Sequence, residues 1–502
     1  MTAPFDPTCC QCRRPSWRDL GTRSYCEPCF TSLTATMKPE DIADPDATDA
    51  TIDGLRYTDA GNARRLVGLA GERHRYVPRW QRWLSWDGKR WSEDHDDVAV
   101  TEAAKDVARY LFTRIGGTNK HERQELIRWG NRSESAAGLA AMVKVARTDP
   151  RVVADHLDLD RDPYSLNVGN GVLHLPSGQL LPHDPKLLIT KLTPVEYIKT
   201  SETVLWDAFL ERVLPDPEVR DFVQRLFGYA LTGSVGEQII VFLIGPGANG
   251  KSVLLNVLRR LLGDYAVVAP RDLLIVQHHE PHPTSVATLR GARVATAVET
   301  EAGARLAESK VKELTGGDDL TARRMREDFW SFSPTHKLFV AANHRPAIRG
   351  ADEGIWRRIR VVPFEVIIPP DERDRGLLQR LEGELPGVLR WAVEGFHRWN
   401  EEGLGLPAAV DLATAEYRAE EDVVGQFLDA CGFTLRNGAS VPAGELRTVY
   451  ESWCADNGTD PLSTAVLANA LRGRGLHDAR KNRGRVWLGL HRADSELFEN
   501  AQ

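Results

Sequence analysis

The stretch QIIVFLIGPGANGKSVLLNVLRRLLGDY, from Gln238 to Tyr265, decides the fold of this 502-residue chain. It opens with an apolar run from Ile239 to Ile244, turns through GPGANGKS, and continues with apolar residues at helical spacing until Gly263. The full G-x-x-x-x-G-K-[ST] pattern therefore stands between a predicted strand and a predicted helix. The sequence predicts a phosphate-binding loop in an α/β fold.

Each residue type in this loop has a role in holding a polyphosphate. Glycines let backbone N–H groups approach phosphate without a Cβ clash, and the helix N-terminus carries a partial positive charge. We expect Lys251 to reach the β- and γ-phosphates and the Ser252 hydroxyl to ligate Mg²⁺. The predicted nucleotide-binding residues are Gly245, Pro246, Gly247, Ala248, Asn249, Gly250, Lys251 and Ser252. A chance match is the alternative, and the flanking strand and helix argue against it.

Composition limits the function classes that remain. The chain is 42% hydrophobic and 27% charged, as in ordinary globular proteins. No apolar run approaches the roughly 20 residues of a membrane span, and the opening MTAPFDPTCC has no signal-peptide pattern. We therefore expect a cytoplasmic protein with no membrane partner and roughly three or four domains. The net charge of −7 means that nucleic-acid binding must come from local patches.

Residues 1–45 contain two cysteine pairs, Cys9 with Cys12 and Cys26 with Cys29, separated by thirteen residues. This C-x2-C spacing suits a tetrahedral Zn²⁺ site, with each pair on a tight turn. The metal would supply folding energy that so short a segment lacks. Cys10 is an alternative to Cys9, although C-x-C is the poorer metal-binding turn, and free cysteines in a tail are the remaining alternative. We expect a structural zinc ribbon followed by a linker, in a reducing compartment.

An α/β domain is predicted over residues 52–200 and a helical collar over residues 201–235. Within the first, Asp87-Gly88 predicts a hairpin turn between tryptophan-rich arms. The side chains that could form a stacking platform for a single strand are Trp80, Trp83, Trp86, Trp91, Arg79, Arg82 and Arg90. Packing inside the hairpin is the simpler interpretation.

This region also contains one candidate metal site and the signals for two helices. Asp158 and Asp160 form a D-x-D pattern that suggests a polymerase metal pair, but their polar surroundings favour ordinary loop residues. Pro215 and Pro217 separate two amphipathic segments, which predicts two helices in the collar.

The predicted ATPase domain, residues 236–410, carries acids after its second apolar run. Arg293 to Val298 predicts a strand, and Glu299 follows it, 48 residues after Lys251. An acid there holds the Mg²⁺ shell or activates water. Glu301 is the second candidate, and solvated glutamates at a strand end are the alternative.

Two polar signals come later in the same domain. Asn343 ends the apolar run of THKLFVAANHRP and could hold the attacking water or the γ-phosphate. Arg357 and Arg358 stand before another apolar strand, 14 and 15 residues after Asn343, and an arginine there could stabilise charge at a neighbouring subunit's nucleotide. A turn asparagine and a surface arginine pair are the alternatives.

Two basic segments are candidates for nucleic-acid contact. Gly316-Gly317 and Asp318-Asp319 predict a turn, followed by a basic loop or hairpin facing phosphates. Residues 411–502 predict three helices and a basic hairpin, the pattern of a winged helix, for which protein contact is the alternative. The candidate residues are Arg323, Arg324, Arg326, Arg472, Arg474, Arg480, Lys481, Arg483 and Arg485.

Eight ordered blocks resemble superfamily 3 helicases, and more closely the phage and plasmid primase-helicase C-terminal family related to the poxvirus primase-helicase. The blocks are TDAGNARRLV, the WDG hairpin, NVGNGVLHL, GYALTG, GPGANGKS, VKELTGGDDLTARR, LFVAANHRP and GIWRRIRVVPF. The resemblance implies an AAA+-like P-loop core in an ATP-driven, Mg²⁺-dependent DNA helicase. Such proteins are usually ring hexamers that translocate on one DNA strand at a replication fork, here of a phage or mobile element in a bacterial host.

The resemblance also implies roles for single residues. Lys251 and Ser252 would bind nucleotide and metal, Glu299 with Glu301 would serve metal and water, Asn343 would be the sensor, and Arg357 the finger in trans. Thr300 separates acids that are often adjacent in this superfamily, which leaves their division of roles open. The primase-polymerase domain often fused upstream is missing, so we expect a separate primase or polymerase. A packaging motor or loader, and a replication initiator with the ATPase as an assembly switch, are the alternative functions.

Overall fold

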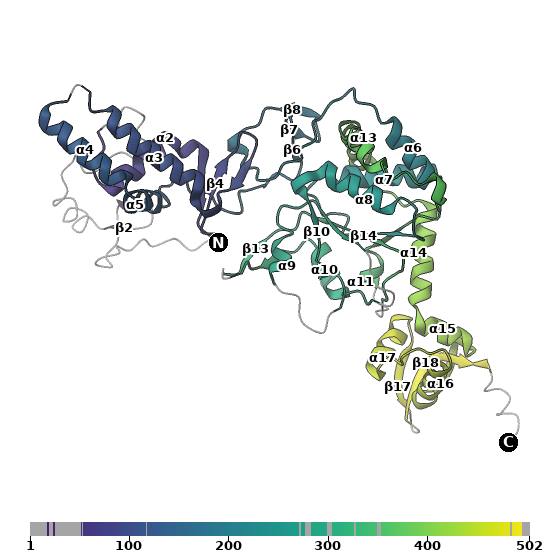
Figure 1. Cartoon of the computed structure of the whole chain (residues 1–502). Coiled ribbons are helices and arrows are strands. Elements are labelled where there is room, and N and C mark those ends of the chain that lie inside the picture. Colours follow the sequence, from purple (N-terminus) through teal and green to yellow (C-terminus); the bar gives the residue numbers. More distant parts are fainter. Residues whose placement is uncertain are drawn as a thin grey trace, which may run out of the picture. The chain divides into compact units, whose positions relative to one another are not determined.

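A computed structural model describes residues 18–19, 24–25, 52, 54–116, 118–270, 273–276, 283–298, 304–325, 328–348, 353–481 and 484–493. The chain forms two compact units (Figure 1). One unit comprises Met1–Arg75 with Asp96–Val153, and the other comprises Tyr76–His95 with Ala154–Gln502. Among the described helices, none is both long enough and apolar enough to cross a membrane.

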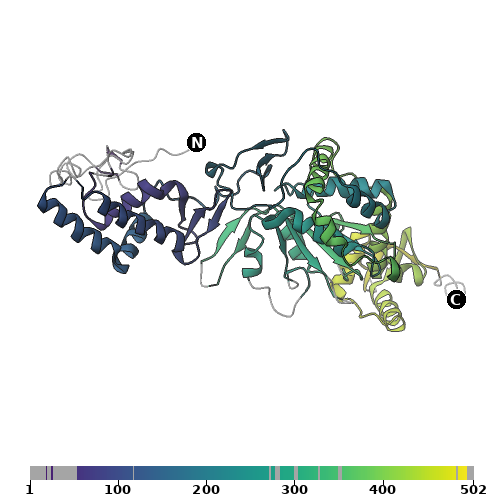
Figure 2. The same ribbon diagram turned by 45° about the horizontal axis from the view of Figure 1, so that its top comes forward.

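The described part of the first unit is mainly a bundle of four helices, which Figure 2 shows in purple and blue. The helices are α2 (Asp59–Ala70), α3 (Val98–Thr113), α4 (Lys120–Glu134) and α5 (Ala136–Ala146). A short antiparallel pair, β1 (Arg18–Asp19) and β2 (Ser24–Tyr25), precedes them in the chain.

A polar contact at the centre of this bundle explains the block TDAGNARRLV. The amide Nδ2 of Asn62 donates to Ser133 Oγ at 2.7 Å, and its Oδ1 accepts from Trp129 Nε1 at 3.1 Å and from Arg65 at 3.2 Å. Arg65 is 1% exposed and also donates to the carbonyl of Arg56 at 3.1 Å. These residues therefore join α2 to α4 and to the preceding loop, which is a structural role.

The second unit is built around a five-stranded parallel sheet. Its strands lie in the order β10 (Ala266–Val268), β11 (Val294–Val298), β14 (Lys337–Ala342), β9 (Ile240–Ile244) and β15 (Ile359–Pro363). All four neighbouring pairs are parallel. The predicted strand before the phosphate loop is β9, which lies between β14 and β15. The α/β core predicted from the sequence is confirmed, and its sheet is parallel.

Helices cover both faces of this sheet (Figure 1). Val241 and Leu243 of β9 face a core formed with α6 (Val204–Val213), α7 (Pro217–Ala230), α8 (Lys251–Leu262), α12 (Leu377–Glu382) and α13 (Leu385–Glu402). Ile240 and Phe242 face a core formed with α9 (Pro283–Ala287), α10 (Glu308–Thr315), α11 (Glu353–Trp356) and α14 (Ala408–Glu421). Burial on both faces explains why the strand sequence is continuously apolar rather than alternating.

Three small antiparallel sheets complete this part of the chain. The tryptophan hairpin is β4 (Arg82–Trp86) with β5 (Trp91–Glu93), joined to β3 (His74–Val77). A second sheet consists of β6 (Ser165–Val168), β7 (Gly171–His174) and β8 (Gln179–Leu181). The basic hairpin predicted after Asp318-Asp319 is β12 (Leu320–Ala322) with β13 (Trp330–Phe332). Both predicted hairpins are confirmed.

The carboxyl-terminal module has its own core. It contains α15 (Val423–Ala430), β16 (Phe433–Pro442), α16 (Ala443–Asp456), α17 (Thr464–Gly473), β17 (His477–Lys481) and β18 (Gly484–Arg492). The strands form an antiparallel sheet in the order β16, β18, β17. The three predicted helices and the predicted strand pair are present, whereas β16 was not predicted.

Helix α14 packs on the parallel-sheet core rather than on this module. Tyr417 is fully buried, and its hydroxyl donates to the carbonyl of Pro346. Thr414 Oγ1 accepts from the amide of Val361 in β15 at 3.1 Å. The boundary predicted between residues 410 and 411 therefore falls inside a helix of the core, and we propose Asp422 as the start of the module.

Candidate functional site

The phosphate loop leaves β9 at Gly245 and enters α8 at Lys251. A Cβ on Gly245 would lie 2.0 Å from the carbonyl oxygen of Phe364. Gly250 has φ +87°, and a Cβ there would lie 2.6 Å from Val213 Cγ1. Both glycines of the motif are therefore required by close packing, and Gly250 also by its left-handed backbone.

Inside the loop, Lys251 is held by acceptors of its own motif. Its ammonium donates to the carbonyls of Gly245 at 2.6 Å and Pro246 at 3.0 Å, and to Asn249 Oδ1 at 3.0 Å. Lys251 is 5% exposed, and burial lowers the pKa of its amine. Asn249 is 2% exposed and donates through Nδ2 to the carbonyl of Phe364 at 2.9 Å. Asn249 therefore connects the lysine to the segment after β15.

This segment supports the loop from outside, and sequence reasoning missed it. The amide of Ile368 donates to the carbonyl of Ala248 at 2.9 Å. Arg373 Nε donates to the carbonyl of Ile368, also at 2.9 Å. The block GIWRRIRVVPF ends at Phe364, the first residue of this segment. Nothing in the sequence indicated that the segment contacts a loop more than 100 residues earlier in the chain.

The ends of three parallel strands meet beside the loop. Ile244 pairs with Ala342, so Gly245 and Asn343 follow their strands at the same level of the sheet. Val298 at the end of β11 pairs with Ala341. Glu299 and Glu301, which come next in the chain, lie outside the described residues. Asn343 and Ser252 are both exposed.

The two arginines before β15 differ sharply in their surroundings. Arg358 is 7% exposed and donates to Thr315 Oγ1 at 3.1 Å and to the carbonyl of Gly354 at 2.6 Å. Arg357 is exposed. Of this pair, Arg357 is thus the exposed side chain and Arg358 the buried one.

The position of Arg357 is set by the register of β15 on β9. Ile359 pairs with Ile240, so Arg357 lies at the amino-terminal end of the strands and Gly245 at their carboxyl end. The five steps of extended chain from Ile240 to Gly245 alone span roughly 17 Å. An arginine side chain cannot span that distance, so Arg357 cannot reach the phosphate loop of its own chain.

The loop of the β12–β13 hairpin carries the first basic cluster. Arg323 lies over the Phe329 ring, 4.8 Å from its centroid. Arg324 donates to Glu93 Oε1 of the tryptophan hairpin at 2.7 Å. Phe329 is 49% exposed and Met325 is 74% exposed. Arg326 lies outside the described residues.

The tryptophans of the hairpin face inward. Trp80, Trp83 and Trp91 are at most 3% exposed. The Trp80 ring lies 6.1 Å from Trp330 in an edge-on arrangement, and Arg290 lies over it at 4.1 Å. The packing interpretation is confirmed for these rings, because buried faces cannot stack on nucleotide bases.

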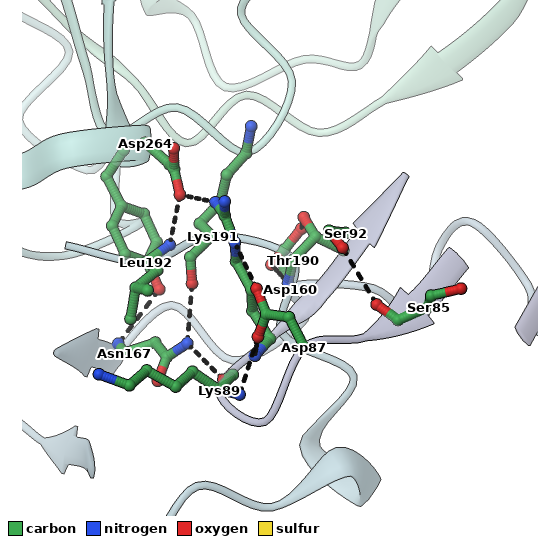
Figure 3. A network of polar contacts seen from close by, with 12 residues as sticks. Ser85, Asp87, Lys89, Ser92, Asp160, Asn167, Thr190, Lys191, Leu192 and Asp264 are labelled. Atoms are coloured by element: carbon green, nitrogen blue, oxygen red, sulfur yellow. Dashed lines mark hydrogen bonds and ion pairs between the residues drawn. The ribbon is translucent and has the colours of Figure 1, made fainter. Parts of the chain in front are cut away.

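A polar network fastens the tryptophan hairpin to the turn that ends α8 (Figure 3). Arg90 forms an ion pair with Asp264, which lies in the short turn after the end of α8 at Leu262. Asn167 donates through Nδ2 to the carbonyls of Lys89 and Lys191, both at 2.9 Å. The hairpin is therefore linked by these contacts to the end of α8.

Asp160 belongs to the same network. It accepts from the amide of Thr190 at 2.6 Å and from its hydroxyl at 2.5 Å, and it lies 3.6 Å from Arg290. Asp158 is 3.8 Å from Arg161 on the surface. The D-x-D pair is thus occupied by protein contacts, as its assignment to a loop predicted.

In the carboxyl-terminal module, part of the basic set is paired with acids. Arg472 and Arg485 approach Asp478 at 3.0 Å and 3.3 Å, and the bond from Arg472 lowers the pKa of that carboxyl. Arg474 pairs with Asp422. These three arginines hold the module together in addition to any ligand contact.

The strand β17 carries the more available cations. Arg480 and Lys481 are exposed, and Lys481 donates to Ser440 Oγ at 3.0 Å. Arg483, in the turn to β18, lies outside the described residues.

The predicted zinc ligands are Cys9, Cys12, Cys26 and Cys29, and all four lie outside the described residues. Among the residues that are described, no group of three or more His, Cys, Asp or Glu is arranged to hold a metal ion. The described pair β1–β2 falls between the two cysteine pairs in the sequence.

Two family models match the chain. One, described as D5 N terminal like, matches residues 63–215. The other, described as a family of unknown function (DUF5906), matches residues 243–358. The first match includes the tryptophan hairpin and the second runs from the end of β9 to Arg358.

Proteins of large DNA viruses are similar to this chain. A protein of Acanthamoeba polyphaga mimivirus, described as a candidate helicase, is 26% identical over 389 residues, which cover 69% of this chain and 40% of that protein. An African swine fever virus protein, described as a candidate primase, is 28% identical over 40% of this chain and 22% of its own length. A candidate helicase of Frog virus 3 is 25% identical over 50% of this chain and 28% of its own length.

The chain thus spans between about a fifth and two fifths of these relatives. Among solved structures, the apo form of the NrS-1 C-terminal region aligns with 83% of this chain and 96% of its own, at 10% identity and a TM-score of 0.44.

Proposed function

The chain belongs to a phage and viral primase-helicase family, and we propose that it is an ATP-dependent DNA helicase of the superfamily 3 type. In this proposal it serves replication of a phage or mobile element and translocates on single-stranded DNA as a hexameric ring. It would work beside a primase or polymerase. The observation that carries the proposal is that Gly245 and Asn343 lie at the carboxyl end of the strands, whereas the exposed Arg357 lies at their amino end.

One half of that site lies at the carboxyl ends of the strands. Gly245 to Ser252 would hold the phosphates, with Mg²⁺ on Ser252 and the acids after β11, and Asn343 would orient water or the γ-phosphate. Its support is the register that brings Gly245 and Asn343 to one level, beside the strand that leads to Glu299. When ATP binds, its phosphates would replace the acceptors that Lys251 now uses.

The other half would come from a neighbouring subunit. Arg357 is exposed and precedes the amino end of β15, and the strands separate that end from the phosphate loop by roughly 17 Å. A side chain in that position can stabilise transition-state charge only in trans. The site would therefore be complete only at an interface between subunits, which is the reason to propose a ring.

Two basic elements would contact DNA. The β12–β13 loop, with Arg323 and Arg324, would follow the strand in the ring, because cations beside an exposed phenylalanine suit a single strand. The three helices and three-stranded sheet of the carboxyl-terminal module have the composition of a winged helix. Its exposed β17 cations would contact the duplex or fork backbone.

Unwinding of a forked duplex tests the function. Wild-type protein should separate the strands with ATP and Mg²⁺, and its ATPase should rise with single-stranded DNA. Lys251→Ala should abolish both, whereas Lys144→Ala, an exposed lysine of α5, is the matched control and should keep both. Hydrolysis without DNA dependence, and without strand separation, would refute the proposal. Translocation along duplex without separation would indicate a packaging motor instead.

The second candidate is a replication initiator that uses the ATPase as an assembly switch. The carboxyl-terminal module favours it, since three helices with a basic hairpin also suit recognition of a duplex site. This candidate predicts a preferred sequence in footprinting, with binding that survives Lys251→Ala. Uniform protection of all sequences would remove it.

For the cysteine segment we propose one Zn²⁺ per chain, held by Cys9, Cys12, Cys26 and Cys29. The support is the C-x2-C spacing and the strand pair between the two halves. Metal analysis of freshly reduced protein should give one zinc per chain, and Cys26→Ala should lose it while Cys431→Ala keeps it. Absence of zinc from reduced wild-type protein would overturn the four-cysteine assignment.

A further inference from the structure

The tryptophan hairpin presents two arginines beside the basic β12–β13 loop. Arg79 donates to the carbonyl of Phe329, at the end of that loop. Arg82, at the start of β4, lies 3.8 Å from Glu93, and Glu93 also pairs with Arg324 at 2.7 Å. Elements more than 200 residues apart in the sequence thus form one continuous charged surface.

The charges of this surface do not cancel. Arg79 comes from the turn before the hairpin, Arg82 from the hairpin, and Arg323 and Arg324 from the loop. Glu93 contacts two of these arginines. The side chains of Arg82 and Arg324 are 38% and 31% exposed. Among the described residues, four guanidinium groups beside the two carboxylates of Glu93 and Asp328 leave an excess of positive charge, which suits a polyanion.

Apolar groups on the same loop indicate which polyanion fits. Phe329 is 49% exposed and Met325 is 74% exposed, directly beside the arginines. Unpaired bases stack on such side chains, whereas duplex DNA offers only its backbone and groove edges. The surface therefore fits a single strand better than a duplex.

From these contacts we infer that the tryptophan hairpin is part of the nucleic-acid site, with Arg79 and Arg82 extending the β12–β13 loop along the single strand. This rests on the proposed function of that loop. The buried tryptophans act as the anchor that positions the arginines, and the phosphates of the strand compete with Glu93 for Arg324 and Arg82. The hairpin is also tied to the turn after α8 through Arg90 and Asp264, so strand contact is linked to the nucleotide-binding helix (Figure 3).

Salt dependence of binding measures the number of phosphate contacts directly. Each contact to a single strand contributes about −0.7 to the slope of log K against log salt. Arg79→Gln with Arg82→Gln should therefore make the slope less negative by about 1.4, so that the affinity advantage of wild type shrinks by about sevenfold between 50 mM and 200 mM salt. Glu93→Gln should have the opposite effect and raise affinity, because the carboxylate that competes with phosphate is gone.

The probe is a fluorescein-labelled oligothymidine of about 20 nucleotides, followed by anisotropy, with a duplex of equal length in parallel. Arg109→Gln with Arg123→Gln, two exposed arginines of the helical bundle, carries the same loss of charge and should keep the wild-type slope. All variants are first compared by thermal unfolding, so that a misfolded protein is not scored as a binding loss.

A parallel variant, Arg323→Gln with Arg324→Gln, separates two kinds of failure. If this variant loses affinity while the Arg79/Arg82 variant keeps wild-type affinity and slope, the hairpin is not part of the site and the present inference is wrong. If both variants bind as wild type does, the inference about the hairpin and the proposed role of the loop are both wrong. Equal losses on oligothymidine and on duplex would contradict the preference for a single strand.

Discussion

Asn249 is the residue through which the phosphate loop is attached to the segment after β15. Its Oδ1 accepts from Lys251 at 3.0 Å, and its Nδ2 donates to Phe364 at 2.9 Å. Asn249→Ala removes both bonds, so the lysine should lose one of its three acceptors and the buried carbonyl of Phe364 its donor. A loss of about 1.4 kcal/mol, or tenfold in nucleotide affinity, is expected.

Titration with a fluorescent ATP analogue measures this effect. Pro246→Ala is the control, because Pro246 is exposed and offers only its carbonyl, which alanine keeps. Equal affinities for wild type and Asn249→Ala would show that the lysine is positioned without Asn249.

His336 makes stability depend on pH. Its side chain is 1% exposed, both ring nitrogens lack a hydrogen-bond partner among the described residues, and burial with help from Lys337 lowers its pKa from 6.5 to about 3. Between these values the unfolded chain binds a proton that the folded protein does not. The contribution of neutral His336 to the free energy of unfolding is therefore complete above pH 6.5 and decreases as the pH is lowered. At pH 5 this contribution is smaller by about 2 kcal/mol.

Urea unfolding at pH 7.5 and pH 5.0 tests this. The difference between the two pH values should be about 2 kcal/mol smaller in His336→Gln than in wild type. His121→Gln should leave the difference unchanged, because His121 has a 78% exposed side chain. An unchanged difference in His336→Gln would mean that the buried ring is protonated in the folded protein.

Sequence reasoning at the residue scale worked where partners are local. The loop from Gly245 to Lys251 is defined by its own neighbours, so its shape followed from the pattern. The choice of Arg357 over Arg358 rested on the family resemblance, since only the fold brings Thr315 to Arg358 and leaves Arg357 exposed. Glu93 carried no signal at all, because its partner Arg324 lies 231 residues away.

Among the elements, α7 and α13 cross at two glycines. A Cβ on Gly228 would lie 2.0 Å from the amide nitrogen of Phe396, and a Cβ on Gly395 would lie 2.1 Å from the carbonyl oxygen of Gln224. The neighbouring atoms are backbone and cannot move aside without separating the helices. Gly395→Ala should therefore lower the free energy of unfolding by about 1–3 kcal/mol.

The control for this substitution is Gly444→Ala. Gly444 lies in the first turn of α16, and a Cβ there would have no atom within 4 Å. Alanine should keep or raise stability there, because it restricts the unfolded chain. Chemical denaturation compares the two variants, and equal stabilities would show that the helix crossing relaxes without cost.

Element prediction succeeded for segments with a strong apolar period or a clear turn. The collar helices, both hairpins and the helices of the carboxyl-terminal module are of this kind. Strand β16 was missed because it is largely polar and exposed, with Asn437-Gly438 in its middle. It is a strand because β18 pairs with both of its ends across an irregular centre, and that information is not local.

On the scale of the whole molecule, the parallel sheet separates two parts of one proposed active site. The phosphate loop and Asn343 follow the carboxyl ends of the strands, and Arg357 precedes the amino end of β15. Two copies placed head to tail would bring the exposed arginine of one to the phosphate loop of the next. Such a heterologous contact closes into a ring when the rotation permits.

Mixing defective subunits tests this arrangement. Arg357→Ala keeps the phosphate loop, and Lys251→Ala keeps the arginine, so an interface that pairs the two intact parts should hydrolyse ATP. In an equal random mixture such interfaces are one in four, so ATPase should recover to about a quarter of wild type if the sites act independently. Arg358→Ala is the comparison variant, because Arg358 makes buried contacts within its own chain. This variant should lose stability, and mixing it with Lys251→Ala should not restore ATPase. Mixtures as inactive as either variant alone would show that Arg357 does not act across the interface.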